Sequence, residues 1–263
     1  MYRCPICNQP LTEKEKSAQC IQGHSFDRAK SGYFNFLIKN QTAFRGDHPT
    51  QIDARRRFLA QDHYLPLAQR IHQIISSALP SVLIDAGCGE GYYTHQLKKR
   101  KPACEMYGFD ISKDAIDKAA KSDRNIHYCV SSVNRLPYQN QCADIITSLF
   151  APVDTDEFAR VLKKDGRLLV VSAHPDHLIE LKQIAYEQVT KHQHKSLDSD
   201  VFSLMNMEEF SFQLTLTQPD ITHLFMMTPY GFRTSVEGKQ RIESKENLTV
   251  TAKFILETYQ KYL

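Results

Sequence analysis

The stretch Asp85-Ala86-Gly87-Cys88-Gly89-Glu90-Gly91 decides the fold, because it gathers three of the chain's ten glycines within five residues. A short apolar run at 82–84 precedes it, and a helical pattern from about 92 to 101 follows it. Glycines let a ligand approach the backbone closely, and the first N–H groups of a helix have no partner within the helix. We therefore predict a ligand-binding turn at the carboxyl end of a buried strand.

The spacing of these glycines narrows the class of ligand. Enzymes that bind dinucleotides use Gly-x-Gly-x-x-Gly, but the third glycine position of that pattern is Tyr92 here. The pattern present, Asp-x-Gly-x-Gly-x-Gly, suits a ligand with a carboxylate and a cationic centre and without phosphates. Asp110 ends the next apolar run, where a carboxylate can bind both ribose hydroxyls. The candidate ligand-binding residues are Asp85, Gly87, Gly89, Gly91 and Asp110.

Strand and helix patterns alternate on both sides of this turn. We expect strands at 82–84, 106–109, 127–130, 144–149 and 168–171, and helices at 92–101, 113–121, 155–164 and 177–190. Ser112 is an expected N-cap, and Gly166 is expected to end a helix. A helical stripe at 67–78 precedes this region, and alternating patterns at 210–216 and 248–256 follow it. The sequence therefore predicts an α/β fold with a parallel sheet, helices on both faces and a late antiparallel pair of strands.

Four metal-ligand residues stand close together near the N-terminus. Cys4-x2-Cys7 and Cys20-x3-His24 form two short pairs separated by twelve residues. Each pair fits one tight turn, and two facing turns complete a tetrahedral site of three sulfurs and one nitrogen, which suits zinc. With four protein ligands no coordination position stays open, so the predicted metal is structural. The alternative is a set of unrelated thiols.

Composition limits the function classes. The chain has 263 residues, 41% hydrophobic residues and a formal charge of +3, which predicts one or two globular domains. No apolar run is long enough for a membrane span, and no signal region follows the N-terminus. The remaining thiols, Cys88, Cys104, Cys129 and Cys142, are expected to be reduced packing residues in a cytoplasmic protein.

The charge is concentrated at the front of the chain. Residues 1–80 carry 11 Lys/Arg and 6 Asp/Glu, which favours a local anionic partner, although ordinary solvated charge also explains it. Aromatic residues accompany these cations. We expect Phe34 and Phe36 to pack around the metal, whereas Tyr33 suits either a core or base stacking. The polar segment with Gly46 and Pro49 suggests domains at 1–37 and 53–263, joined by a linker at 38–52.

The glycine turn and Asp110, in register with their strands, resemble the cofactor site of class I S-adenosylmethionine-dependent methyltransferases. Ser131-Ser132 follows the third strand, where that family contacts adenine. Many relatives carry an Asp there, so this chain departs from the pattern, and Ser132 is the residue that we assign to the cofactor. The segment Asn134-Arg135-Leu136-Pro137-Tyr138 also resembles a common segment of these enzymes.

Two further blocks resemble the RlmA family of large-subunit rRNA (guanine-N1)-methyltransferases. The N-terminal block is Cys4-Pro5-x-Cys7, Cys20, His24-Ser25-Phe26-Asp27, Ala29-Lys30 and Gly32-Tyr33. The catalytic block is 85–95, Ala151-Pro152, His177-Leu178-x-Glu180-Leu181-Lys182 and Met227-Thr228-Pro229. The resemblance implies that Cys4, Cys7, Cys20 and His24 bind zinc, and that Tyr64, Gly89, Glu90 and His177 contact S-adenosylmethionine. It also implies a homodimer whose zinc domains flank an RNA cleft.

The implied reaction is methyl transfer to N1 of a guanine in a hairpin loop of domain II of 23S rRNA. N1 lies on the Watson–Crick edge, so the base must be unpaired or flipped. We expect Phe150 or Pro152 to pack on the guanine. Asp154 is either the acceptor of the N1 proton or a helix-start carboxylate. Arg28, Lys30, Arg45 and Arg55–Arg57 are expected to bind RNA phosphates.

Three other functions remain open at this stage. The same chemistry on a neighbouring loop guanine would place the chain in a macrolide-resistance subclass. A small-molecule methyltransferase with an accessory zinc domain would work without RNA. A zinc protein that binds RNA without catalysis would bind no S-adenosylmethionine.

Overall fold

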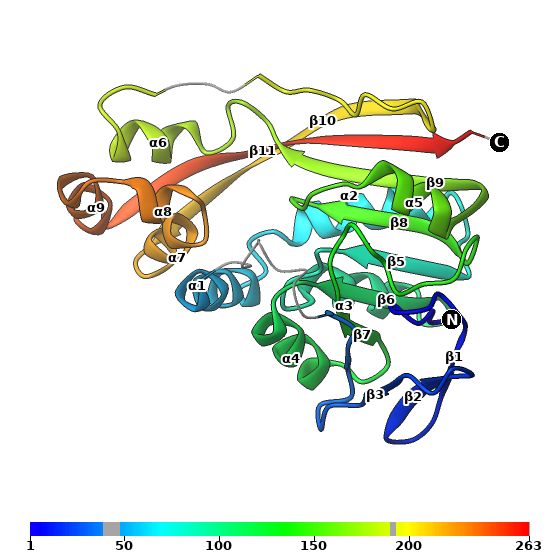
Figure 1. The fold of residues 1–263 in the computed structure, drawn as a ribbon. Coiled ribbons are helices and arrows are strands. Elements are labelled where there is room, and N and C mark those ends of the chain that lie inside the picture. Colours follow the sequence, from blue (N-terminus) through cyan, green and yellow to red (C-terminus); the bar gives the residue numbers. More distant parts are fainter. Residues whose placement is uncertain (39–47, 190–192, 263) are drawn as a thin grey trace.

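A computed structural model describes residues 1–38, 48–189 and 193–262 of the protein. Its main sheet has eight strands in the order β10-β11-β9-β8-β5-β6-β7-β4 (Figure 1). These strands are β4 (Phe34–Asn35), β5 (Val82–Ala86), β6 (Glu105–Asp110), β7 (His127–Val130), β8 (Ala143–Leu149), β9 (Leu162–Ala173), β10 (Phe202–Thr217) and β11 (Asn247–Lys261). Strands β4 to β9 pair in parallel, whereas β11 pairs antiparallel with both β9 and β10. The predicted mixed α/β sheet is confirmed.

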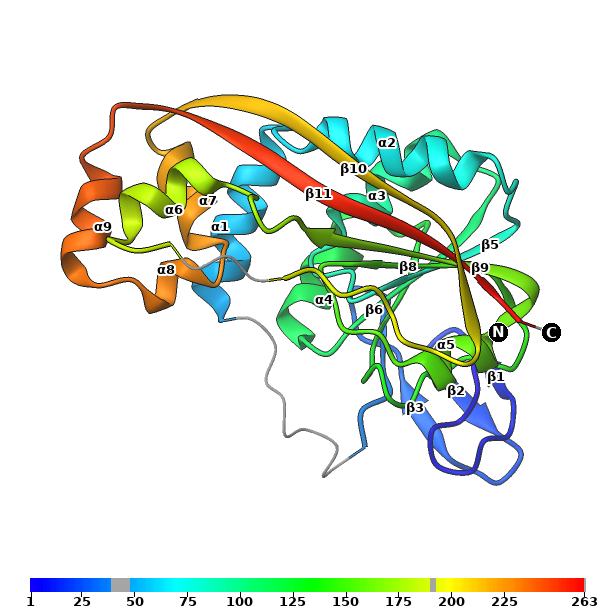
Figure 2. The same cartoon turned by 90° about the horizontal axis from the view of Figure 1, so that it is seen from above.

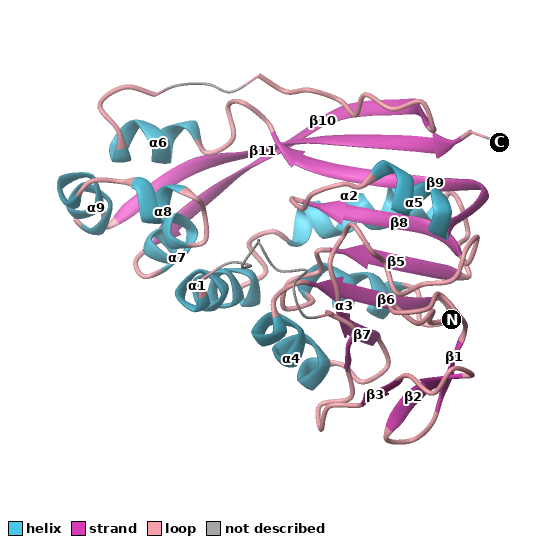
Figure 3. Cartoon of the chain, in the orientation of Figure 1, coloured by secondary structure: helices cyan, strands magenta, loops and turns pink. Residues whose placement is uncertain are grey.

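Helices cover both faces of this sheet (Figure 3). They are α1 (Pro49–Ala60), α2 (Leu65–Ser76), α3 (Tyr92–Arg100), α4 (Lys113–Ser122), α5 (Thr155–Val161), α6 (Ile179–Ala185), α7 (Asp220–Met226), α8 (Tyr230–Arg233) and α9 (Val236–Glu243). Leu67 of α2, Leu97 of α3 and Ile116 of α4 are buried in one hydrophobic cluster, and Phe158 of α5 is buried in a second. Ser112 caps α4 as predicted, because its hydroxyl accepts a hydrogen bond from the Ala115 N–H. No helix in the described ranges is long and apolar enough to cross a membrane.

Strands β10 and β11 are much longer than the sequence pattern indicates. They form an antiparallel ribbon that runs past the end of the parallel strands (Figure 2). Helices α6 to α9 gather at the far end of this ribbon, and α1 packs against α7 there (Figure 1). The parallel strands point towards this group of helices. The ribbon and the helices therefore lie beyond the edge of the sheet where the glycine turn lies.

The N-terminal module shares a core with the large domain. Its own sheet is β1 (Leu11–Glu13), β2 (Ser17–Cys20) and β3 (Ser25–Asp27), but the following strand β4 pairs with β7 of the main sheet. Tyr2, Phe34 and Phe36 are all buried and pack with Tyr107 and Tyr138 in the second cluster. The division at 37 remains a proposal about folding units, since residues on both sides of it fill one core.

Two predicted helices are shorter than expected. The helix predicted to reach Lys164 ends at Val161, because Leu162 is fully buried and pairs with Ala143 as the first residue of β9. Gly166 therefore lies inside a strand. The helix predicted at 177–190 covers Ile179–Ala185 only, and its predicted end at Thr190 is outside the described ranges. Helix α1 begins at Pro49, within the segment assigned to the linker.

Candidate functional site

The four predicted zinc ligands meet at one point of the N-terminal module. Their ligand atoms all lie within 4.8 Å of one another. The Cys7 and Cys20 sulfurs are 3.6 Å apart, and the Nδ1 atom of His24 lies 3.4 Å from the Cys20 sulfur and 3.6 Å from the Cys4 sulfur. A tetrahedral zinc with Zn–S bonds of about 2.3 Å requires ligand separations of about 3.5–3.8 Å. The donor set and its spacing therefore fit zinc.

The local turns explain why these side chains converge. The Ile6 N–H points at the Cys4 sulfur at 3.4 Å, and the Asn8 N–H donates to the Cys4 carbonyl oxygen. Gly23 has a φ of +84°, and its N–H donates to the Cys20 carbonyl oxygen. The left-handed backbone at Gly23 turns the chain so that His24 faces the thiols. This arrangement offers four protein ligands to a structural zinc and leaves no coordination position open.

The glycine turn joins β5 to α3, and its three glycines have different neighbours. All three have positive φ, between +56° and +84°. A Cβ atom on Gly87 would lie 2.4 Å from the Ala151 Cβ, and one on Gly91 would lie 2.6 Å from the Tyr128 hydroxyl. In the part of the chain that the structure describes, and leaving out its chain neighbours, a Cβ on Gly89 would have only the Arg55 Nη1 atom within 4 Å, at 3.9 Å. Gly87 and Gly91 thus permit close packing, whereas Gly89 leaves room for a ligand against the backbone.

Asp85 lies beneath the turn and faces the interior. Its carboxylate is buried and accepts hydrogen bonds from the Thr94 hydroxyl at 2.5 Å and the Thr147 hydroxyl at 2.8 Å. Burial raises the pKa of Asp85 to about 6. These hydrogen bonds connect β5, β8 and α3 below the glycine turn. Asp85 therefore supports the turn from below, and the sequence pattern offered no signal for the two threonines that hold it.

Asp110, at the end of β6, faces the turn directly. Its Oδ2 atom accepts a hydrogen bond from the Gly89 N–H at 3.0 Å, and its Oδ1 atom accepts one from the Ser112 N–H at 2.8 Å. Ser131 is buried, and its hydroxyl donates to the carbonyl oxygens of Ser132 and Arg135. Ser132 is partly exposed, and its hydroxyl accepts a hydrogen bond from the Asn134 N–H. Ser132 is thus the more accessible of the two serines considered for adenine contact.

An aromatic cluster stands beside the glycine turn. Tyr64 precedes α2, and its hydroxyl lies 3.5 Å from the His177 Nε2 atom. The ring of Phe254 lies 5.4 Å from the Tyr64 ring and 4.7 Å from the His177 ring, centroid to centroid. Burial lowers the pKa of His177 to about 3, so its ring is neutral at pH 7. The structure brings Tyr64 and His177 together, although 112 residues separate them in the chain.

Phe150 links this cluster to the glycine turn. Its ring lies 5.6 Å from the Phe254 ring and 6.4 Å from the Tyr93 ring, yet its side chain is 47% exposed. The backbone at Phe150 has a φ of +59°, which is unusual for a bulky residue and is a form of strain that is concentrated at functional sites. The next residue, Ala151, lies against Gly87. An exposed ring therefore stands at the carboxyl edge of the sheet, above the turn.

Asp154 occupies the N-cap position of α5. Its Oδ1 atom accepts a hydrogen bond from the Glu157 N–H at 3.0 Å. This contact corresponds to the helix-start role that the sequence left open. The alternative role as an acceptor of the substrate proton stays a prediction.

The basic residues of the front part of the chain divide into groups. Arg28 donates to Glu13 at 2.9 Å and its guanidinium lies 4.2 Å from the centre of the Phe34 ring, which fixes it within the N-terminal module. Lys30, Arg56 and Arg57 are exposed. Arg45 lies outside the described ranges. Arg55 turns inward to the glycine turn, and the sequence pattern did not distinguish it from its two neighbours.

The stacking role considered for Tyr33 is wrong. Its side chain is 4% exposed and belongs to the hydrophobic cluster of the large domain. A base cannot stack on a ring that is covered on both faces. Phe34 and Phe36 are buried as expected, and Phe26 packs on Phe36 with their centroids 5.2 Å apart.

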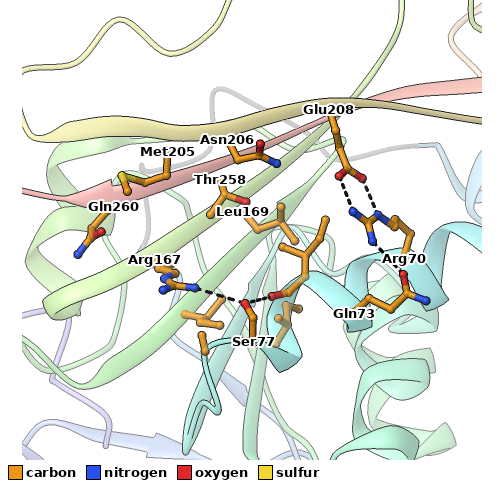
Figure 4. Close-up of a pocket in the computed structure, with 14 residues that line it drawn as sticks. Arg70, Gln73, Ser77, Arg167, Leu169, Met205, Asn206, Glu208, Thr258 and Gln260 are labelled. Carbon is orange, nitrogen blue, oxygen red and sulfur yellow. Dashed lines mark hydrogen bonds and ion pairs between the residues drawn. The ribbon is translucent and has the colours of Figure 1, made fainter.

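A separate cavity lies at the opposite end of the sheet (Figure 4). It is bounded by α2, β9, β10 and β11, with Arg70 paired to Glu208 and Arg167 pointing at Ser77. Its lining residue Ile145 is near the start of β8, whereas the glycine turn follows the end of β5. None of its lining residues belongs to the predicted cofactor set, so the turn and its aromatic cluster remain the candidate active site.

Comparison with known proteins finds a family model for the N-terminal module and another for the large domain. A family model described as "RlmA, N-terminal", a zinc ribbon, matches residues 2–41, and a model described as "Methyltransferase domain" matches residues 80–225. The chain is 29% identical to "Putative 23S rRNA (guanine-N(1)-)-methyltransferase YxjB" of Bacillus subtilis, over 95% of this chain and 94% of that protein.

Two further relatives come from other bacteria. A protein of Micromonospora griseorubida with the same description, apart from the name YxjB, is 32% identical over 68% of each chain. The 23S rRNA (guanine(748)-N(1))-methyltransferase of Streptomyces fradiae is 32% identical over 68% of this chain and 65% of its own length.

Proposed function

Because this chain belongs to the RlmA family of 23S rRNA (guanine-N1)-methyltransferases, we propose that it methylates N1 of a guanine in a hairpin loop of domain II of 23S rRNA. The observation that carries this proposal is the exposed Phe150 ring above the glycine turn, at the edge of the sheet that substrate must approach. A zinc ribbon that shares a core with the catalytic domain supports a large substrate that contacts both.

S-adenosylmethionine, when bound, supplies an electrophilic methyl group on a sulfonium. The residues around the turn fit this cofactor. Gly89 leaves space beside its Cα atom, and the Glu90 Oε1 atom is buried without a hydrogen-bond partner among the described residues. We assign Asp110 to the ribose hydroxyls and Ser132 to the adenine. We assign Tyr64 and neutral His177, whose side chains lie 3.5 Å apart, to the apolar side of the site, where they would keep water from the reacting atoms.

Guanine N1 carries a proton that must leave when the methyl group arrives. In the proposed complex Phe150 packs on one face of the flipped base, and Pro152 borders it. Asp154 is the carboxylate that we assign as the acceptor of the N1 proton. Asp154→Asn tests this assignment cleanly, because asparagine is an equally good N-cap and preserves α5. Full turnover of Asp154→Asn across the pH range would remove Asp154 from the mechanism.

The decisive experiment is methyl transfer from labelled S-adenosylmethionine to protein-free rRNA from cells that lack the modification. We expect one label, recovered as 1-methylguanosine, at a single position in the domain II hairpin. Phe150→Ala should reduce turnover, and the affinity for S-adenosylmethionine should stay within about twofold. Label at the neighbouring guanine would assign the chain to the resistance subclass. Unlabelled RNA with intact cofactor binding would favour a small-molecule substrate.

The proposal includes a homodimer. Strand β10 is an edge strand of the main sheet, and it exposes Leu204, Met205 and Met207. Exposed apolar side chains on an edge strand favour association with another chain. Sedimentation equilibrium should give twice the chain mass, and Met205→Lys combined with Met207→Lys should shift the equilibrium towards monomer. A wild-type monomer at all concentrations would contradict this part of the proposal.

A further inference from the structure

Arg55 differs from its neighbours in the Arg55–Arg57 run by the direction of its side chain. Arg56 and Arg57 are exposed on α1, whereas Arg55 is half-buried. Among the described residues other than the chain neighbours of Gly89, the Nη1 atom of Arg55 is the only atom that a Cβ on Gly89 would find within 4 Å. One guanidinium therefore lies near the one glycine of the turn that has open space beside its Cα atom.

Helix α1 is held firmly in this position. Phe58 and Leu59 are buried in the main cluster, and Lys118 of α4 forms an ion pair with Asp53 of α1. On its other side α1 packs against α7. These contacts on two sides hold helix α1 in place, and so they fix the point from which the Arg55 side chain extends towards the turn.

Glu90 supplies the opposite charge at the same place. Its Oε1 atom is buried and has no hydrogen-bond partner among the described residues. Burial raises the pKa of Glu90, and the positive charge of Arg55 acts against this effect. A buried carboxylate oxygen without a donor is costly, because it has lost water and gained nothing in exchange. A cationic ligand group bound beside the turn would restore the missing hydrogen bond.

We propose that Arg55 binds the methionine carboxylate of S-adenosylmethionine, while Glu90 accepts the α-ammonium group of the same ligand. The amino-acid end of the cofactor is a zwitterion, and Arg55 and Glu90 present one charge of each sign around the space beside Gly89. A guanidinium matches a carboxylate with two parallel hydrogen bonds, which lysine cannot reproduce. Arg55 then belongs to the cofactor site, and only Arg56 and Arg57 of the run remain for RNA.

The test compares two ligands in the absence of RNA. Calorimetry measures the affinity of the full-length protein for S-adenosylhomocysteine and for its decarboxylated analogue, which keeps the ammonium group. Wild type should prefer S-adenosylhomocysteine by about 10- to 100-fold, the range for a charge-assisted hydrogen bond. Arg55→Met should lose this preference, because it should weaken S-adenosylhomocysteine by that factor and the analogue by less than about twofold. Arg57→Met removes the same charge from an exposed position and should change neither affinity.

Two further variants keep the inference open to refutation. Arg55→Lys retains the charge and should lose part of the preference, which also covers failure of Arg55→Met to fold. Glu90→Gln should weaken both ligands, since both carry the ammonium group. An equal loss of both ligands in Arg55→Met and Arg55→Lys would mean that Arg55 only supports the turn. Unchanged affinities in both variants would also overturn the proposal. Because RNA is absent, either result leaves the proposed rRNA substrate untouched.

Discussion

Asp85 combines two features that rarely coexist, full burial and a carboxyl group. Its pKa is raised to about 6 by burial, against about 3.9 in an unfolded chain. The folded protein therefore holds the proton more tightly than the unfolded chain does. The stability linked to Asp85 is complete below pH 4 and is lost as the pH rises through about 6, by about 3 kcal/mol in total.

Asp85→Asn should remove this pH dependence. Urea unfolding of wild type and variant at several pH values gives the difference in unfolding free energy. That difference should move in favour of the variant by roughly 1.5 kcal/mol between pH 5 and pH 8, where the zinc site is least disturbed by acid. Parallel curves for the two proteins would show that the carboxyl does not titrate in this range.

A neighbouring loop leaves no room for a side chain at Gly87. Because a Cβ there would lie 2.4 Å from the Ala151 Cβ, Gly87→Ala must push the loop carrying Phe150 away from the turn. We expect a loss of about 2–3 kcal/mol from overpacking and from the φ of +68°. Ala151→Gly opens the space, so the double variant should recover part of the loss in denaturant unfolding. Strict additivity of the two changes would rule out this contact as the cause.

At the scale of elements, helix α1 carries arginine side chains on two sides, and we propose a different function for each side. Its inward residue Arg55 is assigned to the cofactor, and its exposed residues Arg56 and Arg57 remain candidates for RNA phosphates, together with Lys30 of the N-terminal module. A helix offers this division because residues one position apart point about 100° apart.

The combined change Lys30→Glu, Arg56→Glu and Arg57→Glu should weaken rRNA binding and flatten its dependence on salt. Each lost phosphate contact lowers the slope of log affinity against log salt by about 0.7–0.9. Filter binding at several salt concentrations measures this slope. Charge reversal at the exposed Lys245, just after α9, serves as the control, since it changes the net charge at another place. Equal slopes for wild type and the triple variant would move the RNA footprint elsewhere.

At the scale of the whole molecule, the zinc module is fused to the catalytic domain by β4 and by the packing of Tyr2, Phe34 and Phe36. A module this small depends on its metal for folding. Loss of zinc should therefore also destabilise the part of the large domain that packs against residues 1–37. Deletion of those residues would expose the apolar face that they cover, and so it cannot separate RNA recognition from stability.

Cys7→Ser should abolish the bound zinc and raise hydrogen exchange in β7, the strand that pairs with β4. Cys142→Ser changes a half-buried thiol that is not one of the four zinc ligands, and it should leave hydrogen exchange in β7 unchanged. Mass spectrometry of exchanged peptides and elemental analysis give both readouts. Unaltered exchange in β7 after zinc loss would show that the module folds as an independent unit.

The sequence by itself determined the glycine turn, the alternation of strands and helices, and the four metal ligands. Each of these signals is local, since a strand, a helix or a zinc turn is written in residues that lie close together in the chain. The predicted end of the helix at 155–164 was wrong because Leu162 pairs with the neighbouring strand β8, and this pairing outweighed the helical pattern. The family resemblance, rather than any local pattern, pointed to Tyr64 and His177.

Only the tertiary structure decided how these parts meet. The aromatic cluster joins Tyr64, His177 and Phe254 from three distant segments. Tyr33 is buried in the core of the large domain, because the strand that follows it, β4, pairs with β7 at the edge of the main sheet. Likewise Arg55 is separated from Arg56 by the packing of α1 alone. Contacts of this kind depend on which face of an element is covered, and that is settled by the whole fold because every buried face needs a partner.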